Sequence, residues 1–85
     1  MAYQVILKPS AAKSVRKLDR DTQRRVLRVL EVLAQEPRPA GVLKMAGDDN
    51  LWRVRLGDYR VVYEIHDRQL IVVVVRVVHR KDVYR

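Results

Sequence analysis

Apolar residues in the first half of the chain are spaced as in helices. A short run of β-branched and aromatic residues, residues 3–8, predicts a strand that ends at Pro9. Proline suits the first turn of a helix, because its fixed φ angle and its missing N–H are tolerated there. Over residues 10–18 the apolar positions fall on one face of a helix: Ala11, Val15 and Leu18. The chain is therefore expected to begin with a strand and a short helix.

A second apolar repeat is the clearest in the chain. It places four residues at helical spacing, namely Val26, Val29, Leu30 and Leu33. Asp21 is the predicted N-cap, and the helix is expected to end at Pro37, because the residue before a proline avoids the α region. Three arginines fall mostly on the other faces and are interpreted as a solvated surface: Arg24, Arg25 and Arg28. The two segments predict a helical hairpin.

The second half of the chain changes to the period of two that is typical of strands. Residues 37–41 predict a stiff connector, residues 42–45 a short strand and residues 46–50 a loop. The next residues alternate between two faces of a strand, with Trp52, Val54 and Leu56 on one face and Leu51, Arg53 and Arg55 on the other. Gly57-Asp58 predicts the turn of a hairpin.

The returning strand, residues 59–66, alternates as well, and residues 67–68 predict the next turn. Residues 69–78 are nearly continuous in valine and isoleucine, which predicts a central strand covered on both faces. The three strands form an antiparallel meander, with the helices on its apolar face. The predicted fold is α+β: an N-terminal strand, a helical hairpin and a mostly antiparallel sheet of about four to five strands, in a single domain spanning residues 1–85.

Charge points to an anionic partner. Eighteen Lys and Arg residues face ten Asp and Glu residues, which leaves a net charge of +8, and thirteen of the cations are arginine. Guanidinium groups offer a planar fork of donors that matches phosphate and stacks on bases, so nucleic acid leads the list of partners. Basic surfaces also serve solubility, so charge alone does not decide between the two.

The chain is expected to be a cytoplasmic protein. It has no cysteine, which is compatible with a reducing compartment and excludes disulfides and thiolate chemistry. Its first residues have neither the basic head nor the apolar stretch of a signal peptide. The longest apolar run, residues 70–75, is far shorter than the roughly 20 residues needed to cross a bilayer.

Three arginines are expected to converge on one face of the sheet. Alternation puts Arg53 and Arg55 on the same side of their strand, and a tight hairpin brings Arg60 next to them. Crowded guanidinium groups repel one another, so the arrangement is most reasonable where an anion sits between them. The alternative is an exposed face kept soluble by arginine, with Glu64 neutralising part of the charge.

The carboxyl-terminal tail, residues 79–85, is the second candidate segment. It carries apolar residues that a frayed end has little reason to contain, so it is expected to fold back and to place Arg80 and Tyr84 at the edge of the arginine cluster. His79 is open to two interpretations, a hydrogen-bonded structural group or a catalyst. Metal chemistry has little support, because the chain has two histidines and no ligand pattern beyond Asp48-Asp49.

A metal-independent ribonuclease would fit these residues. It needs a base for the ribose 2′-hydroxyl, cations for the pentacoordinate phosphate and an acid for the departing 5′-oxygen. Tyr84 is the candidate base, and surrounding guanidinium groups would favour its phenolate form.

The sequence resembles the RelE branch of the RelE/ParE toxin superfamily over nearly its whole length. The resemblance is carried by the opening strand and by three later tracts, residues 42–44, 51–65 and 76–84. It implies a toxin that enters the ribosomal A site and cuts messenger RNA by 2′-hydroxyl attack. It also implies a RelB-like antitoxin, expected to have an acidic amphipathic segment, that wraps the toxin, and it implies no cofactor.

The resemblance also assigns roles to single residues. Arg60 corresponds to the phosphate-binding arginine, Arg80 to the proposed acid or transition-state stabiliser, and Tyr84 to the catalytic tyrosine. The residues expected to bind RNA or its phosphates are Arg53, Arg55, Lys44, Arg76 and Lys81. Some family members have lysine in place of Arg53 and Arg55, and arginine is a poor base, so more of the catalysis falls on Tyr84.

Two other functions remain open. A ParE-like toxin would share the fold and inhibit DNA gyrase by binding it, without a nuclease site. A non-catalytic RNA-binding module would need only basic charge and a sheet surface, although Tyr59, Tyr63 and Trp52 are few for a base-stacking platform. No membrane partner is expected.

Overall fold

The structure is a computed structural model that describes residues 2–45, 47 and 50–83. Its first seven elements follow the predicted order, namely β1 (Gln4–Leu7), α1 (Pro9–Arg16), α2 (Arg20–Gln35), β2 (Leu43–Lys44), β3 (Trp52–Leu56), β4 (Tyr59–His66) and β5 (Ile71–His79). A short helix that was not predicted, α3 (Arg80–Val83), follows them. The α+β fold class is therefore confirmed.

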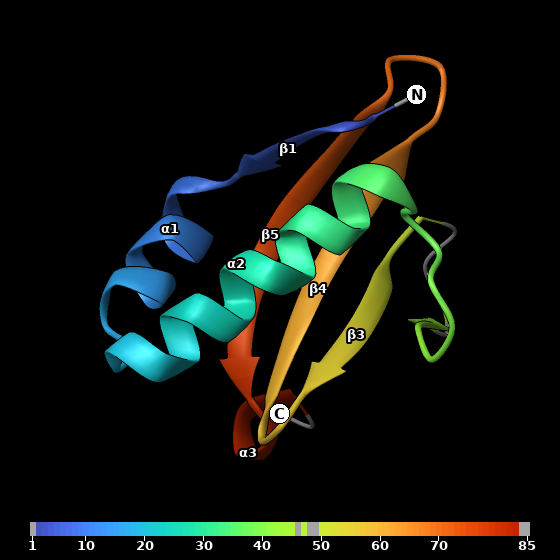
Figure 1. Ribbon diagram of the computed structural model, residues 1–85. Coiled ribbons are helices and arrows are strands. Elements are labelled where there is room, and N and C mark those ends of the chain that lie inside the picture. The colour runs from blue at the N-terminus through green and yellow to red at the C-terminus, as the bar shows by residue number, and fades with distance from the viewer. Residues whose placement is uncertain (1, 46, 48–49, 84–85) are drawn as a thin grey trace.

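All five strands belong to one mixed sheet, in the order β1-β5-β4-β3-β2 (Figure 1). The strands β3 to β5 form the predicted antiparallel meander, β2 extends it by pairing antiparallel with β3, and β1 pairs with β5 in parallel. The helical hairpin makes this possible, because it carries the chain from β1 at one edge of the sheet to β2 at the other edge, from which the later strands lead back to β5. It returns the chain across the sheet between β1 and the meander (Figure 1).

The two long helices begin at side chains that suit their first turns. Pro9 occupies the start of α1, where its lack of an N–H costs nothing. Asp19, and not the predicted Asp21, is the N-cap of α2, because its carboxylate accepts a hydrogen bond from the Thr22 backbone N–H at 3.2 Å. Asp21 lies inside the first turn, where an acidic side chain still interacts favourably with the helix dipole.

The core lies between α2 and one face of the sheet. The helix buries the apolar residues that its sequence repeat predicts, Val26, Leu30 and Leu33. They pack with the predicted inward positions of β4, namely Val61, Tyr63 and Ile65. Ala11 of α1 is buried in the same cluster, and Trp52, Val54 and Leu56 of β3 pack against it. The alternation of β3 and β4 is thus confirmed.

The strand β5 differs from the expectation of a strand covered on both faces. Only alternate residues are buried, Val72, Val74 and Val77, while Arg76 is exposed. The spacing from Val74 to Val77 reflects a bulge, since Val62 pairs with Arg76 and the next residue, Tyr63, pairs with Val74. The extra residue turns Arg76 away from the core.

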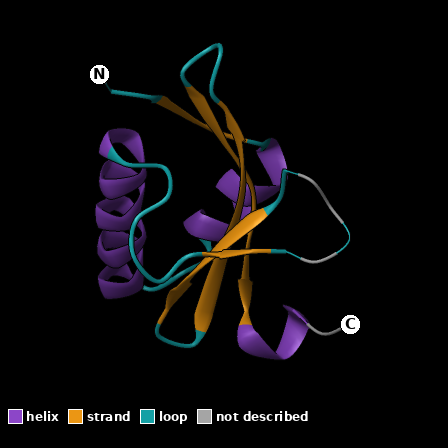
Figure 2. Cartoon of the chain, turned by 90° about the vertical axis from the view of Figure 1, so that its right-hand side faces the viewer, coloured by secondary structure: helices purple, strands orange, loops and turns teal. Residues whose placement is uncertain are grey.

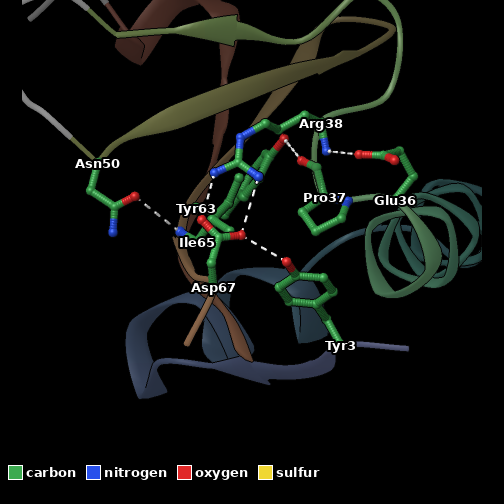
Figure 3. Close-up of polar contacts among 8 residues, drawn as sticks. All are labelled: Tyr3, Glu36, Pro37, Arg38, Asn50, Tyr63, Ile65 and Asp67. Atoms are coloured by element: carbon green, nitrogen blue, oxygen red, sulfur yellow. Dashed lines mark hydrogen bonds and ion pairs between the residues drawn. The ribbon is translucent and has the colours of Figure 1, made fainter. Parts of the chain in front are cut away.

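A set of polar contacts ties the connector after α2 to the sheet (Figure 3). The Tyr63 hydroxyl donates a buried hydrogen bond to the Pro37 carbonyl at 2.7 Å. Arg38 forms a salt bridge with Asp67 at 2.9 Å, and the Tyr3 hydroxyl donates to the same carboxylate at 2.7 Å. The Arg38 guanidinium also lies over the Trp52 ring, 5.1 Å from its centroid.

Within the described residues, no helix is both long and apolar enough to cross a membrane.

Candidate functional site: an arginine face on the open side of the sheet

Four arginines lie on the face of the sheet that points away from α2, and we call them the arginine face: Arg53, Arg55, Arg60 and Arg76. Residues directly opposite each other in an antiparallel pair share one face. The register pairs Arg55 with Arg60, and it pairs Val62 with Arg53 on one side and Arg76 on the other. The predicted alignment of Arg53, Arg55 and Arg60 is therefore confirmed as geometry, and their role stays a prediction.

Val62 shows how closely these side chains cover the strand. It is only 1% exposed although it points away from the helices. Its cross-strand neighbours Arg53 and Arg76 carry long aliphatic stems that can cover apolar surface while the charged heads stay in water. The arginine face therefore has an apolar residue, Val62, beneath the stems of its arginines and charged groups at its surface.

The β3–β4 turn fixes two of the guanidinium groups. Arg55 donates from Nε to the Gly57 carbonyl at 3.3 Å, and Arg60 donates from Nη1 to the Tyr59 carbonyl at 3.1 Å, with Gly57 O at 3.5 Å. Arg53, Arg55 and Arg60 line an open hollow of about 260 Å³ together with Gly41 and Leu43. Such a hollow is large enough for a phosphate group and part of a nucleotide.

The arginine face is cationic without compensation among the residues that the structure describes. Glu64, the acid expected to neutralise part of this charge, accepts from His66 Nε2 at 3.0 Å. No salt bridge involves Arg53, Arg55, Arg60 or Arg76 within the described ranges. Like charges that are held together without a counter-charge favour the binding of an anion.

The tail turns back toward this turn at Arg80, as expected. The Arg80 backbone N–H donates to the Asp58 carbonyl at 2.6 Å, and its Nε lies 3.8 Å from Asp58 Oδ1. Figure 2 shows α3 on the opposite side of the sheet from α2, which is the side of the arginine face. Both side chains are more than half exposed, so the ion pair is weak and leaves Arg80 available to a ligand.

His79 makes structural contacts. Its ring packs edge-on against Tyr59, with centroids 5.2 Å apart, and its Nδ1 accepts a hydrogen bond from the Lys81 backbone N–H at 3.3 Å. Of the two interpretations of His79, these contacts fit the structural one.

One predicted site residue, Lys44, lies away from the arginine face. Lys44 pairs with Trp52, so it lies on the other side of the sheet, with its ammonium group 5.8 Å from the Trp52 ring centroid. Successive residues of a strand point to opposite faces, and in β2 it is Leu43 that pairs with Arg53, so Lys44 points to the other face. Tyr84 lies outside the described residues, and Lys81 is exposed on α3.

Sequence reasoning treated Gly57 and Asp58 only as a turn. In the structure the Gly57 carbonyl accepts from two arginines, and Asp58 holds Arg80. The sequence signal that could have identified Asp58 is its position as an acidic residue in the turn between two strands that carry arginines. Within the described part of the chain, no three His, Asp or Glu side chains come together as a metal site would require.

The sequence and the structure are both similar to known toxins of toxin–antitoxin systems. A sequence model described as "ParE toxin of type II toxin-antitoxin system, parDE" matches residues 5–84. A protein of Escherichia coli described as a putative RelE-like toxin protein is 34% identical over 87 residues, covering 99% of this chain and 92% of the relative.

Solved structures with the same fold come from bacteria and archaea. The RelE–RelB complex of Pyrococcus horikoshii contains a chain with a TM-score of 0.85 and 30% identity, covering 96% of this chain and 99% of that one. The toxin–antitoxin complex RelBE2 of Mycobacterium tuberculosis gives a TM-score of 0.83 at 27% identity, covering 94% and 100%. The isolated RelE toxin of E. coli gives 0.82 at 28% identity, covering 98% and 92%.

Proposed function

The chain belongs to the RelE/ParE superfamily of type II toxin–antitoxin toxins, and from this premise we propose that it is a ribosome-dependent endoribonuclease that cleaves messenger RNA in the A site. The observation that carries the proposal is the arginine face, where Arg55 and Arg60 are fixed at one turn with no acidic partner among the described side chains and Arg80 arrives at the same turn. This arrangement supports the binding of a scissile phosphodiester.

The chemistry that we propose needs no metal ion. Tyr84 removes the proton of the ribose 2′-hydroxyl, and the 2′-oxygen attacks the adjacent phosphorus. Arg60 stabilises the charge that develops on the pentacoordinate phosphate, and Arg80 stabilises the departing 5′-oxygen as its bond to phosphorus breaks. The 5′-oxygen takes a proton from a water molecule, and Tyr84 returns the 2′ proton to the solvent. The products are a 2′,3′-cyclic phosphate and a free 5′-hydroxyl.

Primer extension on ribosome-bound messenger RNA tests this proposal. Purified chain is added to ribosomes that carry a messenger with an empty A site, and new ends are expected in register with the codon. The same messenger without ribosomes should be cut poorly, because the ribosome orients the substrate. Fragments with 5′-hydroxyl ends are expected, whereas 5′-phosphate ends would point to attack by water and contradict the proposed mechanism.

Variants connect the cleavage to the arginine face. Arg60→Ala is expected to lower the single-turnover cleavage rate by about 100-fold or more, as the loss of one donor to a transition-state oxyanion does in other enzymes. Arg68→Ala is the matched control, because Arg68 is exposed in the turn at the other end of β4. Equal rates for the two variants would remove the proposed site.

A second candidate function is inhibition of DNA gyrase, and the match to the ParE description favours it. It predicts that the purified chain blocks supercoiling by gyrase and leaves ribosome-bound messenger intact. This pair of results would replace the nuclease proposal.

The proposed partner that silences the toxin is an antitoxin with an acidic amphipathic segment. The solved relatives include complexes with RelB antitoxins, and a net charge of +8 suits an acidic binder. Co-expression of a short neighbouring reading frame should relieve growth arrest if that frame encodes the partner.

A further inference from the structure

A second arginine cluster lies on the outer surface of α2, on the other side of the sheet from the arginine face. Arg24, Arg25 and Arg28 are exposed and, with Asp21, line an open hollow of about 410 Å³. We call these three arginines the α2 arginine face. The sequence alone favoured a solvated surface here, because helix exteriors are commonly charged.

A contact at the β3–β4 turn connects the two arginine surfaces. The Arg25 guanidinium reaches from α2 to Gly57, where a Cβ placed on the glycine would lie 3.3 Å from Arg25 Nη2. The carbonyl of the same glycine accepts from Arg55. Guanidinium groups therefore approach the β3–β4 turn from both sides of the sheet, Arg55 from the open side and Arg25 from α2.

Retaining these charges works against the stability of the helix. Arg24 and Arg28 stand four residues apart, where like charges destabilise a helix by roughly 0.2 to 0.5 kcal/mol. Asp21 compensates little, because it lies 3.9 Å from Arg24 and both side chains are largely exposed. A ligand that supplies negative charge would remove this penalty.

The lining of the hollow distinguishes between two kinds of anionic ligand. Three of the four residues around it are arginines, the fourth is Asp21, and none is apolar. A protein–protein interface usually has an apolar, well-packed centre, whereas a phosphate backbone needs donors only. Arg24 and Arg28 are about 6 Å apart along the helix axis, so each can hold a separate phosphate.

We propose that the α2 arginine face binds the phosphate backbone of folded RNA and holds the toxin on the ribosome while the arginine face of the sheet holds the strand to be cut. This inference rests on the proposed function. Because the two surfaces lie on opposite sides of the sheet, they contact different segments of RNA. Loss of the α2 arginine face should therefore weaken binding and leave the chemical step intact.

The test compares two double variants with the wild type. Arg24→Ala/Arg28→Ala removes two charges from the α2 arginine face, and Lys13→Ala/Arg68→Ala removes two exposed charges elsewhere. The probe is purified 70S ribosomes carrying a messenger with an empty A site, and the dissociation constant is measured at several salt concentrations. Thermal midpoints no lower than that of the wild type would show that both variants fold.

The α2 variant is expected to bind at least about tenfold more weakly, with a salt slope smaller by about 2, since each lost phosphate contact removes about 0.9 from the slope. The control variant should resemble the wild type in both. At saturating toxin, all three proteins should cleave the messenger at the same single-turnover rate. A lower rate for the α2 variant at saturation would contradict the proposed separation of binding from chemistry.

Three further outcomes would overturn the inference. The α2 variant could bind ribosomes as the wild type does, or the wild type could fail to bind them. The third outcome is that binding of the α2 variant to poly-L-glutamate, a stand-in for an acidic polypeptide, falls as much as its binding to ribosomes, which would indicate a site for any polyanion. Failure of the proposed function gives a different result, ribosome binding by the wild type without cleavage.

Discussion

Tyr63 illustrates how a single polar group is accommodated in the core. Its side chain is the largest among those that are fully buried, and its hydroxyl donates to the Pro37 carbonyl at 2.7 Å. Burial raises the pKa of the Tyr63 hydroxyl to about 12, because the phenolate would lose its hydration. The hydroxyl therefore stays protonated and donates at every pH at which the protein works.

Removal of this hydroxyl should destabilise the fold. Tyr63→Phe is expected to lower the free energy of unfolding by about 1 to 3 kcal/mol, because the buried Pro37 carbonyl loses its donor. Urea denaturation of the variant and the wild type gives the value. Tyr59→Phe, at a partly exposed position, is the control and should cost less than about 0.5 kcal/mol. Equal costs for both substitutions would show that the buried hydrogen bond contributes no more than an exposed hydroxyl.

At the scale of elements, a salt bridge joins three segments that are distant in sequence. Asp67 in the β4–β5 turn accepts from Arg38 of the connector and from Tyr3 just before β1. The Arg38 guanidinium, and then the Tyr3 hydroxyl, lower the pKa of the Asp67 carboxyl below its ordinary value of 3.8. The carboxylate is therefore stabilised in its charged form in the folded protein.

The contribution of Asp67 should disappear in acid. A carboxyl whose pKa is lowered by folding stabilises the protein above its unfolded pKa, and this stabilisation is lost as the pH falls through the folded value. Asp67→Asn should therefore be less stable than the wild type at pH 7, and the difference should vanish as the pH falls below 3.8. Chemical denaturation across this pH range is the measurement. A stability difference that persists unchanged at the lowest pH would show that the Asp67 carboxylate is not its source.

The elements that follow from the sequence are those with a clear period. The strand β4 runs over the predicted residues, Tyr59–His66, and α2 buries its predicted apolar repeat. The run of valines that becomes β5 has no alternation to interpret, so its bulge and its open face were not predicted. The bulge is what places Arg76 beside Val62 and not in the core.

The part of the candidate site that lies on regularly alternating strands could likewise be predicted from the sequence. Strict alternation was sufficient to align Arg53, Arg55 and Arg60 on one side. The edge strand β2 has only two residues, so its parity, and with it the side of Lys44, depends on pairing that the sequence does not specify. The contact between Arg25 and Gly57 joins a helix to a turn 32 positions later, and no local pattern indicates it.

At the scale of the whole molecule, the positive charge is distributed over both sides of the sheet. The net charge of +8 on 85 residues is accompanied within the described residues by few ion pairs, and those are substantially exposed. Exposed pairs stabilise a protein by about 0 to 1 kcal/mol each. Repulsion among the cations is therefore expected to exceed the attraction within the pairs, and the protein should behave as a compact polycation.

This balance predicts that salt stabilises the free toxin. When the ionic strength rises from about 0.05 M to about 0.5 M, the screening length falls and repulsion weakens. The thermal midpoint, followed by circular dichroism, should rise by roughly 4 °C or more, which corresponds to about 1 kcal/mol for a domain of this size. Arg55→Ala/Arg60→Ala should raise the midpoint at low salt and reduce its salt dependence more than Lys13→Ala/Arg68→Ala does, because its charges are paired across adjacent strands. A midpoint that falls with salt would mean that ion pairs outweigh repulsion, and the arginine face would then have no unfavourable energy for a bound phosphate to relieve.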